Sequence, residues 1–580
     1  MIIRIIKKNK TKNGSFFVEP DEIFLDSKNL QNFNRQQFEG RIERPISKKT
    51  IYFLGFLFLF FIGIFGIRLV YLQIQKGETY FARSQNNFLE KAIIFTNRGI
   101  IYDRNKIELA WNKPARDATQ TVADEKTEEK TDETTIPIRA YLSSGFSHLL
   151  GYISYPTRDK GGNYWQSEFI GINGLEKEYN EKLKGENGSK IIETDALGKI
   201  YSENIVNAPK QGTDLITTID VRIQKELFDF IKNLSENNSF VGGGGVLLDV
   251  RNGEVIASTN FPEYNSEILS LGKDSEKING YINDKRKFFL DRVVSGLYTP
   301  GSIVKPFFAL GALTEGVIDP YKKILSIGSI SIPNPYFPDQ KTIFKDWKIH
   351  GWTDMAQALA VSSDVYFYSI GGGYEEQNGL GIVKLEKYAR LFGIGEKTEI
   401  DLPNETRGVI PSPEWKIKNF PDDPWRIGNT YHTAIGQYGF QVTPMEMVRA
   451  IGAIANNGKL LTPHLILGDV EKENKVSMID IEKEYFDVVH KGMRQAVTYG
   501  TAVALDVPYV QVAAKTGTAQ LGVAKNKVNS WVIGFFPYEN PKYAFVVMME
   551  SGPASGNVGA TSVMRALLDW MSINTPEYFE

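Results

Sequence analysis

The strongest constraint on this chain is an uninterrupted apolar run near its N-terminus. Residues 50–67 (TIYFLGFLFLFFIGIFGI) contain no charged side chain. As a helix rising about 1.5 Å per residue, the run would extend about 27 Å, close to the roughly 30 Å hydrocarbon core of a bilayer. A buried helix of that length in a soluble protein would normally keep one polar face, and this run has none. The pattern therefore predicts a single membrane-spanning helix.

The residues around this run predict its orientation. Arg41, Arg44, Lys48 and Lys49 precede it, which is typical of the cytoplasmic side of a membrane helix. The following residues, LVYLQI, offer no small-residue cleavage site, so we expect a retained signal-anchor. The chain is then a single-pass protein of the cell (inner) membrane, with its N-terminus cytoplasmic and its larger part periplasmic or extracellular.

Composition excludes several classes of function. The 580 residues include no cysteine, which rules out disulfides, a thiol nucleophile, a lipidated cysteine and thiolate metal sites. The net charge of −2 gives no sign of a nucleic-acid partner. No cofactor or metal is expected. Asp346 and His350 could act as metal ligands, but such a pair is more often structural.

Changes in composition along the chain predict four regions. Residues 117–135 are rich in Thr, Glu, Asp and Lys and nearly free of apolar side chains, so we expect a disordered acidic loop there. The predicted regions are a cytoplasmic tail (1–49), a transmembrane signal-anchor (50–74), a β-rich pedestal of the dimerisation type that includes the acidic loop (75–210), and a main domain (211–580).

The main domain has the pattern of a mixed α+β fold. A helix is predicted after Asp220, with Ile223, Leu227, Phe230 and Ile231 on one face. Residues 246–257 read as two strands joined at an Asn-Gly turn. Residues 531–536 and 543–549 read as two further strands, and residues 560–571 as a helix. Strands at both ends of the domain predict one sheet covered by the helices between them.

A possible nucleophile lies in this domain. Ser302 and Lys305 follow a Thr-Pro-Gly turn and precede an apolar helical run. Residues three apart face the same side of a helix, so the lysine amine could activate the serine hydroxyl. The helix N-terminus would favour the oxyanion that forms in acyl transfer. The spacing alone is a weak signal, because Ser270 and Lys273 share it in a polar segment that we expect to be a loop.

Two further motifs strengthen the interpretation. Ser362-Ser363-Asp364 is a short polar segment between apolar runs, where it could also be a helix cap. Lys515-Thr516-Gly517-Thr518 follows a small-residue strand pattern, where it could also be a turn. Its lysine and hydroxyls could bind a carboxylate, and Gly517 would let a substrate backbone approach.

Together the three motifs resemble the Ser-x-x-Lys, Ser-x-Asn and Lys-Thr-Gly signatures of the penicillin-binding serine acyltransferases. Segments without a catalytic role, such as residues 98–105, 148–153 and 171–176, are similar to the pedestal of the class B penicillin-binding proteins, most of all the elongation type. The resemblance implies the fold of that family: an antiparallel sheet flanked by helices, preceded by a pedestal and one transmembrane helix. It also implies a peptidoglycan D,D-transpeptidase that cross-links stem peptides ending in D-Ala-D-Ala and is acylated by β-lactams.

The resemblance also assigns roles to residues. Ser302 would be the nucleophile and Lys305 its base, with Ser362, Asp364 and Lys515 in one hydrogen-bond network. Thr516, Gly517 and Thr518 would bind the substrate, with the backbone N–H groups of Ser302 and Thr518 as the oxyanion hole. A polytopic glycan polymerase would be a partner.

The sequence departs from the family signature at Asp364 and leaves several alternative functions open. Asp364 stands where most of the family has Asn, and its carboxylate would favour charged lysines. A D,D-carboxypeptidase or β-lactamase would need a base for water, for which Glu405 is available. A septal transpeptidase and a non-catalytic penicillin-sensing scaffold are the remaining alternatives.

Overall fold

The computed structural model of the chain contains two compact units. One consists of residues up to Glu90 together with Ile192–Ser202, and the other of Lys91–Ile191 together with Glu203–Glu580. The acidic loop 117–135 and residues 1–47 of the predicted tail lie outside the described residues. The structure describes residues 48–85, 88–114, 136–142, 144–194, 200–334, 336–337, 339–473, 475–522, 524–556 and 558–580.

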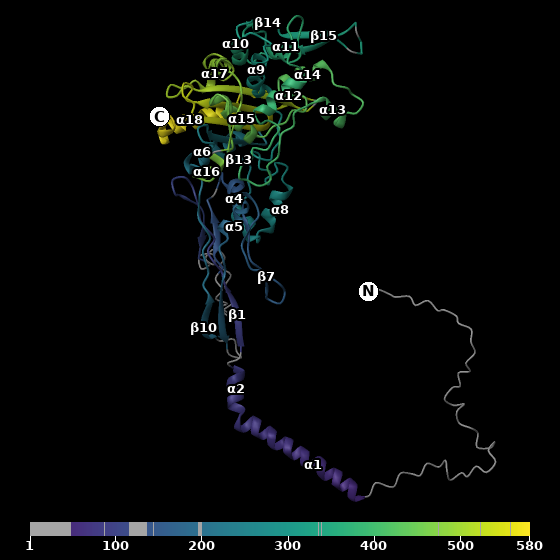
Figure 1. The fold of residues 1–580 in the computed structure, drawn as a ribbon, viewed down its shortest axis with the longest axis vertical. Helices are drawn as coiled ribbons and strands as arrows, with labels where there is room; N and C mark the ends of the chain where they lie inside the picture. Colours follow the sequence, from purple (N-terminus) through teal and green to yellow (C-terminus); the bar gives the residue numbers. More distant parts are fainter. Residues whose placement is uncertain are drawn as a thin grey trace, which may run out of the picture. The chain divides into compact units, whose positions relative to one another are not determined.

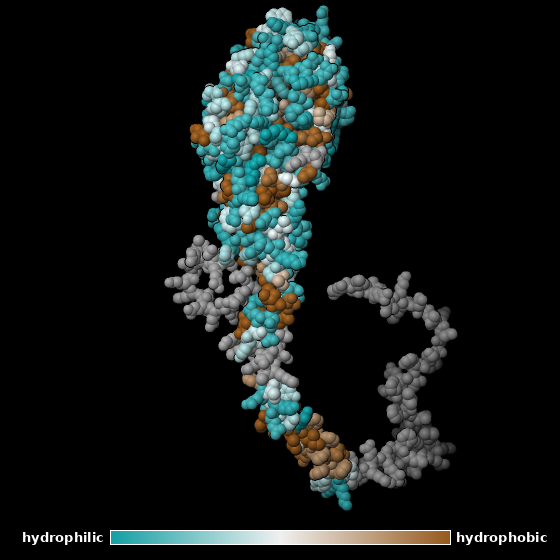
Figure 2. Space-filling model, turned by 60° about the vertical axis from the view of Figure 1, so that its left-hand side comes forward, coloured by the Kyte–Doolittle hydropathy of each residue, from teal (hydrophilic) through white to brown (hydrophobic). Residues whose placement is uncertain are grey.

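The first unit carries the apolar run predicted to span a membrane. Helix α1 (Lys48–Val70) continues into a π-helical turn (Tyr71–Gln75) and is followed by α2 (Gly77–Gln85). Within the described residues, Lys48–Gln75 is the one helical run long and apolar enough to cross a bilayer. No side chain of α1 is buried in the protein, and its apolar surface is the brown band along the helix in Figure 2. So large an exposed apolar surface requires apolar surroundings, which supports the predicted anchor.

The second unit begins with a β-rich region. A four-stranded sheet has the order β11-β2-β3-β4. A turn at residues 103–105 joins β2 to β3, and the Asp103 carboxylate accepts hydrogen bonds from the backbone N–H groups of Asn105 and Ile107. The strands that lie wholly in this region are β2 (Ile101–Tyr102), β3 (Glu108–Lys113), β4 (Ile138–Tyr141), β5 (Ile153–Ser154), β6 (Thr157–Arg158), β7 (Tyr164–Gln166), β8 (Ile170–Gly171) and β11 (Leu215–Ile216). A further sheet has the order β1-β9-β10, and its strands β1 (Phe88–Ile94), β9 (Gly188–Thr194) and β10 (Ile200–Asn207) each include residues of both units.

A buried cluster of charges links this sheet to the short helices α4 (Gly174–Glu178) and α5 (Asn180–Leu183). A third short helix of the region is α3 (Ser147–Leu150). Glu176 of α4 accepts hydrogen bonds from Arg98 Nε at 2.5 Å and from Arg139 Nε at 2.7 Å, and all three side chains are almost fully buried. Burial acts to raise the pKa of Glu176, but the Arg139 and Arg98 charges outweigh it and lower the pKa. Two cations therefore hold one carboxylate ionised inside this region.

The main domain is built on a five-stranded antiparallel sheet of order β13-β12-β22-β21-β20. Its strands are β12 (Gly242–Asp249), β13 (Val255–Phe261), β20 (Ala513–Leu521), β21 (Lys527–Phe536) and β22 (Tyr543–Pro553). Alternate residues of each strand point to opposite faces, so Leu247 and Val547 belong to one core and Val246 and Val546 to the other. The predicted strands thus form one sheet, with β20 at its edge.

Helices cover both faces of this sheet (Figure 1). α6 packs against β12 and β13, and α18 packs against β21 and β22 over the same core. α15 packs against β12, β21 and β22 on the opposite core. The helices of the domain are α6 (Val221–Asn237), α7 (Ser266–Leu271), α8 (Ser275–Asn283), α9 (Lys305–Thr314), α10 (Met355–Val361), α11 (Asp364–Gly372), α12 (Gly381–Leu391), α13 (Pro413–Asn419), α14 (Ile427–Ala434), α15 (Pro444–Ala455), α16 (Val470–Glu473), α17 (Lys483–Thr498) and α18 (Ala560–Asn574).

A lobe of short strands lies in the sequence between α9 and α10. β14 pairs with β17, β15 pairs with β16, and later in the chain β18 pairs with β19. Their bounds are β14 (Ile324–Ser326), β15 (Ser329–Pro333), β16 (Lys341–Lys345), β17 (Gly351–Thr353), β18 (Lys459–Leu461) and β19 (Val476–Met478).

Two local expectations were wrong. Ser270 lies on α7 and is buried, whereas a polar loop was predicted there. Its hydroxyl accepts a hydrogen bond from the Ile153 N–H, which makes it a packing residue. The alternative interpretation of Lys515–Thr518 as a turn is also wrong, because the motif lies inside β20 and its pairing with β21 continues to Leu521.

Candidate active site

Ser302 lies at the start of an apolar helical run, Gly301–Thr314, in the main domain. A 3₁₀ turn, Gly301–Val304, runs directly into α9, as predicted for the first helical turn. The Ser302 side chain is partly exposed, and within the described residues its hydroxyl has no hydrogen-bond partner. Lys305 is fully buried. The two side chains are not hydrogen bonded to each other, although such pairs often tighten only when substrate binds.

The turn that carries Ser302 is fixed by three segments distant in the sequence. The Gly301 N–H donates to the Gly436 carbonyl at 2.9 Å, and Tyr298 and Val442 exchange two backbone hydrogen bonds. A side chain at Gly436 would collide with the Gly301 carbonyl. The Trp531 indole donates to the Thr299 carbonyl at 3.0 Å. The segments that contain Gly436, Val442 and Trp531 therefore position Ser302.

The edge strand β20 passes directly against this turn. A Cβ on Gly517 would lie 2.8 Å from the Pro300 carbonyl oxygen and 2.8 Å from the Ile303 side chain, so only glycine fits. The Thr518 carbonyl lies close enough to Gly301 to contact a Cβ built there at 3.1 Å. The Lys-Thr-Gly-Thr motif and Ser302 are thus neighbours in space.

The polar segment at Ser362–Asp364 joins α10 to α11. Ser362 ends α10 with φ +57°, a left-handed conformation that a non-glycine residue seldom adopts, and such residues concentrate at functional sites. Ser363 caps α11, because its hydroxyl accepts from the Tyr366 N–H. The cap interpretation is therefore right for Ser363, while the Ser362 hydroxyl points to the lysines.

Two buried lysines share the Ser362 hydroxyl. Lys515 Nζ lies 2.8 Å from Ser362 Oγ, and Lys305 Nζ lies 3.3 Å from it. Lys305 Nζ also donates to the Ser362 carbonyl at 2.9 Å and to an Asp364 carboxylate oxygen at 2.6 Å. The structure therefore brings together four of the predicted residues in one connected network, with Ser302 at the start of the same helix as Lys305.

The two lysines of this network have different electrostatic surroundings. Lys305 forms the ion pair with Asp364. Burial lowers the pKa of Lys515 well below its ordinary value, the Lys305 charge lowers it further, and Asp364 opposes both effects. The Lys515 amine therefore releases its proton more easily than an ordinary lysine.

Asp346 holds the Ser362–Asp364 segment in place through hydrogen bonds. Its carboxylate accepts from the Ser363 hydroxyl at 2.8 Å and from the Val365 N–H at 3.0 Å. His350 Nε2 lies 3.4 Å from its other oxygen, so the two form a structural pair. Within the described residues no group of three or more His, Asp or Glu side chains is placed to hold a metal.

Sequence reasoning missed two residues beside the motifs. The Thr516 and Thr501 hydroxyls share a hydrogen bond of 2.6 Å, and the Trp347 indole donates to the Ser362 carbonyl at 3.2 Å. Thr501 follows a glycine at the end of α17 and Trp347 lies in an irregular segment, so neither belongs to a recognisable local pattern. Only the contacts in the folded chain reveal them.

The possible base for water is not brought to the site. Glu405 is buried, and its carboxylate accepts hydrogen bonds from the Thr398 N–H and hydroxyl and from the Glu399 N–H. It stabilises its own loop, which counts against a hydrolytic function.

The candidate site for serine acyl transfer thus combines a free serine hydroxyl at a helix start, two buried lysines that share a second serine, and a glycine-containing edge strand. Residues 243–569 match the penicillin binding protein transpeptidase domain, and residues 132–217 match the penicillin-binding protein dimerisation domain. The first match spans more than half of the chain, so the chain belongs to the penicillin-binding protein transpeptidase family.

Individual relatives agree in sequence and in fold. The chain is 28% identical to the peptidoglycan D,D-transpeptidase MrdA of Escherichia coli (strain K12), over 90% of this chain and 94% of the relative. It is similar to Helicobacter pylori PBP2, solved in complex with MreC (TM-score 0.67, 28% identity, 84% of this chain and 100% of that one). It is also similar to Pseudomonas aeruginosa PBP2 in complex with WCK 5153 (TM-score 0.65, 27% identity, 84% and 98%).

Proposed function

We propose that the chain is a peptidoglycan D,D-transpeptidase in which Ser302 forms the acyl-enzyme. The observation that carries the proposal is the pair of buried lysines around the Ser362 hydroxyl, next to an unpartnered Ser302 hydroxyl. A serine reacts with an amide only when a base takes its proton, and a buried lysine with a lowered pKa can serve as that base.

Acylation begins when Ser302 Oγ attacks the carbonyl carbon of the penultimate D-Ala of a stem peptide. The hydroxyl proton passes to the Lys305 amine, the backbone N–H groups of Ser302 and Thr518 stabilise the oxyanion, and the C–N bond breaks. Ser362 delivers a proton to the leaving D-Ala. An amine of a second stem peptide then attacks the ester and releases Ser302.

The ion pair with Asp364 raises the question of how Lys305 becomes a free base. The Ser362 hydroxyl lies within hydrogen-bond distance of both amines, so it can accept a proton from Lys305 while it gives its own to Lys515. Lys515 is suited to receive that proton because its amine is neutral more readily than an ordinary lysine. The base is therefore the pair of lysines joined by Ser362.

The substrate carboxylate binds next to the edge strand. Thr516 and Thr518 present hydroxyls there, and the Thr501 hydroxyl orients that of Thr516. The absence of a side chain at Gly517 brings the strand within reach of the Ser302 turn. β-Lactams, which mimic a D-Ala-D-Ala end, would acylate the same serine.

Covalent labelling with a fluorescent penicillin tests the proposal. Wild type should retain the label for hours, Ser302→Ala should take up none, and Ser270→Ala should label like wild type. An unlabelled wild type would refute the acyltransferase assignment, and a label lost within minutes would indicate a hydrolase instead.

The anchor and the pedestal complete the proposal. The apolar helix Lys48–Gln75 holds the enzyme at the cell membrane, with the main domain on the periplasmic side. The pedestal, residues 75–210, is the docking module for a polytopic glycan polymerase during cell-wall elongation. The similar Helicobacter pylori PBP2 forms a complex with MreC, which supports an assembly role for such proteins. Polymerase activity that is unchanged when an unrelated spacer replaces the pedestal would count against this role.

A further inference from the structure

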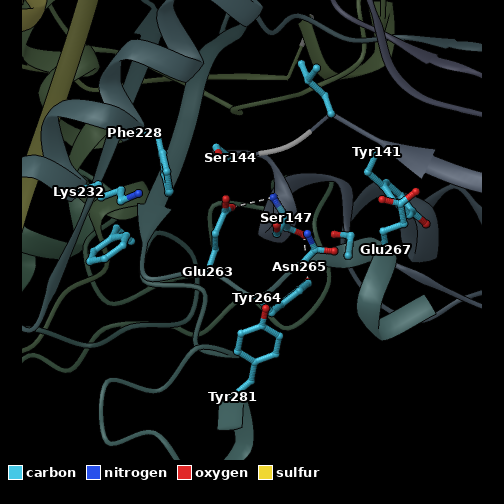
Figure 3. Close-up of a pocket in the computed structure, with 13 residues that line it drawn as sticks. Tyr141, Ser144, Ser147, Phe228, Lys232, Glu263, Tyr264, Asn265, Glu267 and Tyr281 are labelled. Atoms are coloured by element: carbon cyan, nitrogen blue, oxygen red, sulfur yellow. Dashed lines mark hydrogen bonds between the residues drawn. The ribbon is translucent and has the colours of Figure 1, made fainter. Parts of the chain in front are cut away.

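A cavity in the second unit is lined by none of the residues of the candidate active site (Figure 3). Its volume is about 250 Å³, room for about eight waters at roughly 30 Å³ each. Its walls come from residues 141, 142, 144 and 147, from the loop between β13 and α7, and from helices α6 and α8. The first wall belongs to the matched dimerisation domain and the loop to the matched transpeptidase domain. The cavity therefore lies where these two regions meet.

One wall is a carboxylate held rigidly in place. Glu263 accepts hydrogen bonds from the backbone N–H of Gly145 at 2.6 Å and of Ser147 at 2.9 Å, one on each oxygen. Gly145 is itself fixed, because its carbonyl accepts from the Gln224 amide at 2.6 Å and the Thr259 hydroxyl at 2.9 Å. Each carboxylate oxygen keeps lone-pair capacity for a further donor.

The facing wall carries a cation. Lys232 of α6 lines the cavity, and in Figure 3 its side chain extends toward the space beside Glu263. Within the described residues Lys232 has no ion-pair partner, whereas Lys225 on the same helix pairs with Asp229 at 2.7 Å. The cavity thus contains the Lys232 amine and the Glu263 carboxyl group, which form no hydrogen bond or ion pair with each other. Burial raises the pKa of Glu263 to about 7, so a bound cation would favour its ionised form.

The rest of the lining suits a small polar molecule with an apolar middle. Phe228, Phe261 and Tyr264 provide aromatic surface. The Ser266 hydroxyl, which also lines the cavity, has no hydrogen-bond partner within the described residues. Glu267 adds a second carboxylate on the α7 side. Separated groups of both signs, with a free hydroxyl beside them, call for a ligand that carries both charges.

We propose that this cavity binds a zwitterion of amino acid or dipeptide size, with its ammonium at Glu263 and its carboxylate at Lys232. The bound molecule contacts both the dimerisation-type region and the transpeptidase region, so it strengthens the junction between them. The site does not depend on the identity of the catalytic serine.

Calorimetric titration of the detergent-solubilised full chain tests this site. The probes are D-alanine and D-alanyl-D-alanine, each compared with its N-acetylated form, which lacks the ammonium, and its C-terminal amide, which lacks the carboxylate. We expect each zwitterion to bind, and each analogue to bind at least about tenfold more weakly because a charge-assisted contact is lost. Equal affinity of a zwitterion and its analogues would overturn the proposal, as would no binding of either zwitterion.

Variants assign the binding to this cavity. Lys232→Gln and Glu263→Gln should each weaken binding of the zwitterion by about tenfold, while Lys225→Gln, on the same helix but paired elsewhere, should leave it unchanged. The wild-type affinity should persist after the chain is treated with penicillin. Binding that survives Lys232→Gln, or that is abolished by Lys515→Ala, would place the ligand elsewhere and refute the site.

Discussion

Two clusters of charged side chains, one in the pedestal and one in the main domain, are alike in charge but differ in function. In the pedestal Arg98 and Arg139 enclose the carboxylate of Glu176. In the main domain Lys305 pairs with Asp364, and Lys515 joins the same network through the Ser362 hydroxyl. Each cluster has two basic side chains and one acidic side chain.

The two clusters differ in whether their basic side chains can lose a proton. A guanidinium does not lose its proton in a protein, so the arginine cluster is a permanent ionic clamp. A buried lysine readily becomes neutral, and burial lowers the pKa of Lys515 well below its usual value. The pedestal cluster therefore maintains structure, and the lysine cluster can move protons.

Replacing a lysine by arginine should break this distinction most strongly. Lys305→Arg keeps the charge but removes the ability to accept a proton, so the rate of acylation by penicillin should fall by about 10³-fold. Stopped-flow labelling measures the rate. Lys273→Arg, the lysine of the decoy Ser270 motif, is the matched control and should leave it unchanged. A labelling rate near that of wild type in a folded Lys305→Arg would show that the lysine pair does not act as a base.

Removing the carboxylate of the pedestal cluster should have the largest effect on stability. Glu176→Gln leaves two buried arginines without their counter-charge, which should lower the free energy of unfolding by about 3–5 kcal/mol. Denaturant titration checks this, with the exposed Glu178→Gln on the same helix as a control within about 0.5 kcal/mol of wild type. The folded fraction should still be acylated at the normal rate. A slowed acylation with unchanged stability would reverse the assigned roles.

Substitution of Thr501 should have a smaller effect, which should appear in the KM for a stem-peptide substrate. Thr501→Val removes the hydroxyl bonded to Thr516, so KM for a stem-peptide substrate should rise by about three- to tenfold with kcat little changed. Thr501→Ser should restore the KM. A fall in kcat alone would place Thr501 in the proton network instead of the carboxylate site.

The sequence predicted what depends on local pattern. The anchor helix, the α6 helix after Asp220, the Asn-Gly hairpin and the two C-terminal strands all appear, because their apolar periodicity and turn residues act over short distances. The three motifs were found in the same way, and the structure brings their residues together.

What the sequence did not predict comes from contacts between distant segments. The support of the Ser362 segment by Asp346 joins residues that approach only in the folded lobe, and the same holds for the Thr501–Thr516 bond. The orientation of Lys305 toward Asp364 and Ser362 also depends on where α11 packs. Spacing placed Ser302 and Lys305 on one face of a helix, but it could not show where the amine points.

The pH dependence of acylation tests the central claim most directly, that a neutral lysine of the pair receives the proton. The acylation rate of wild type should rise with pH around a midpoint well below the usual pKa of lysine, because burial lowers the pKa of Lys515. Asp364→Asn removes the carboxylate that holds protons on the pair, so its midpoint should lie at lower pH than that of wild type. A rate independent of pH, or the same midpoint in both proteins, would contradict the account.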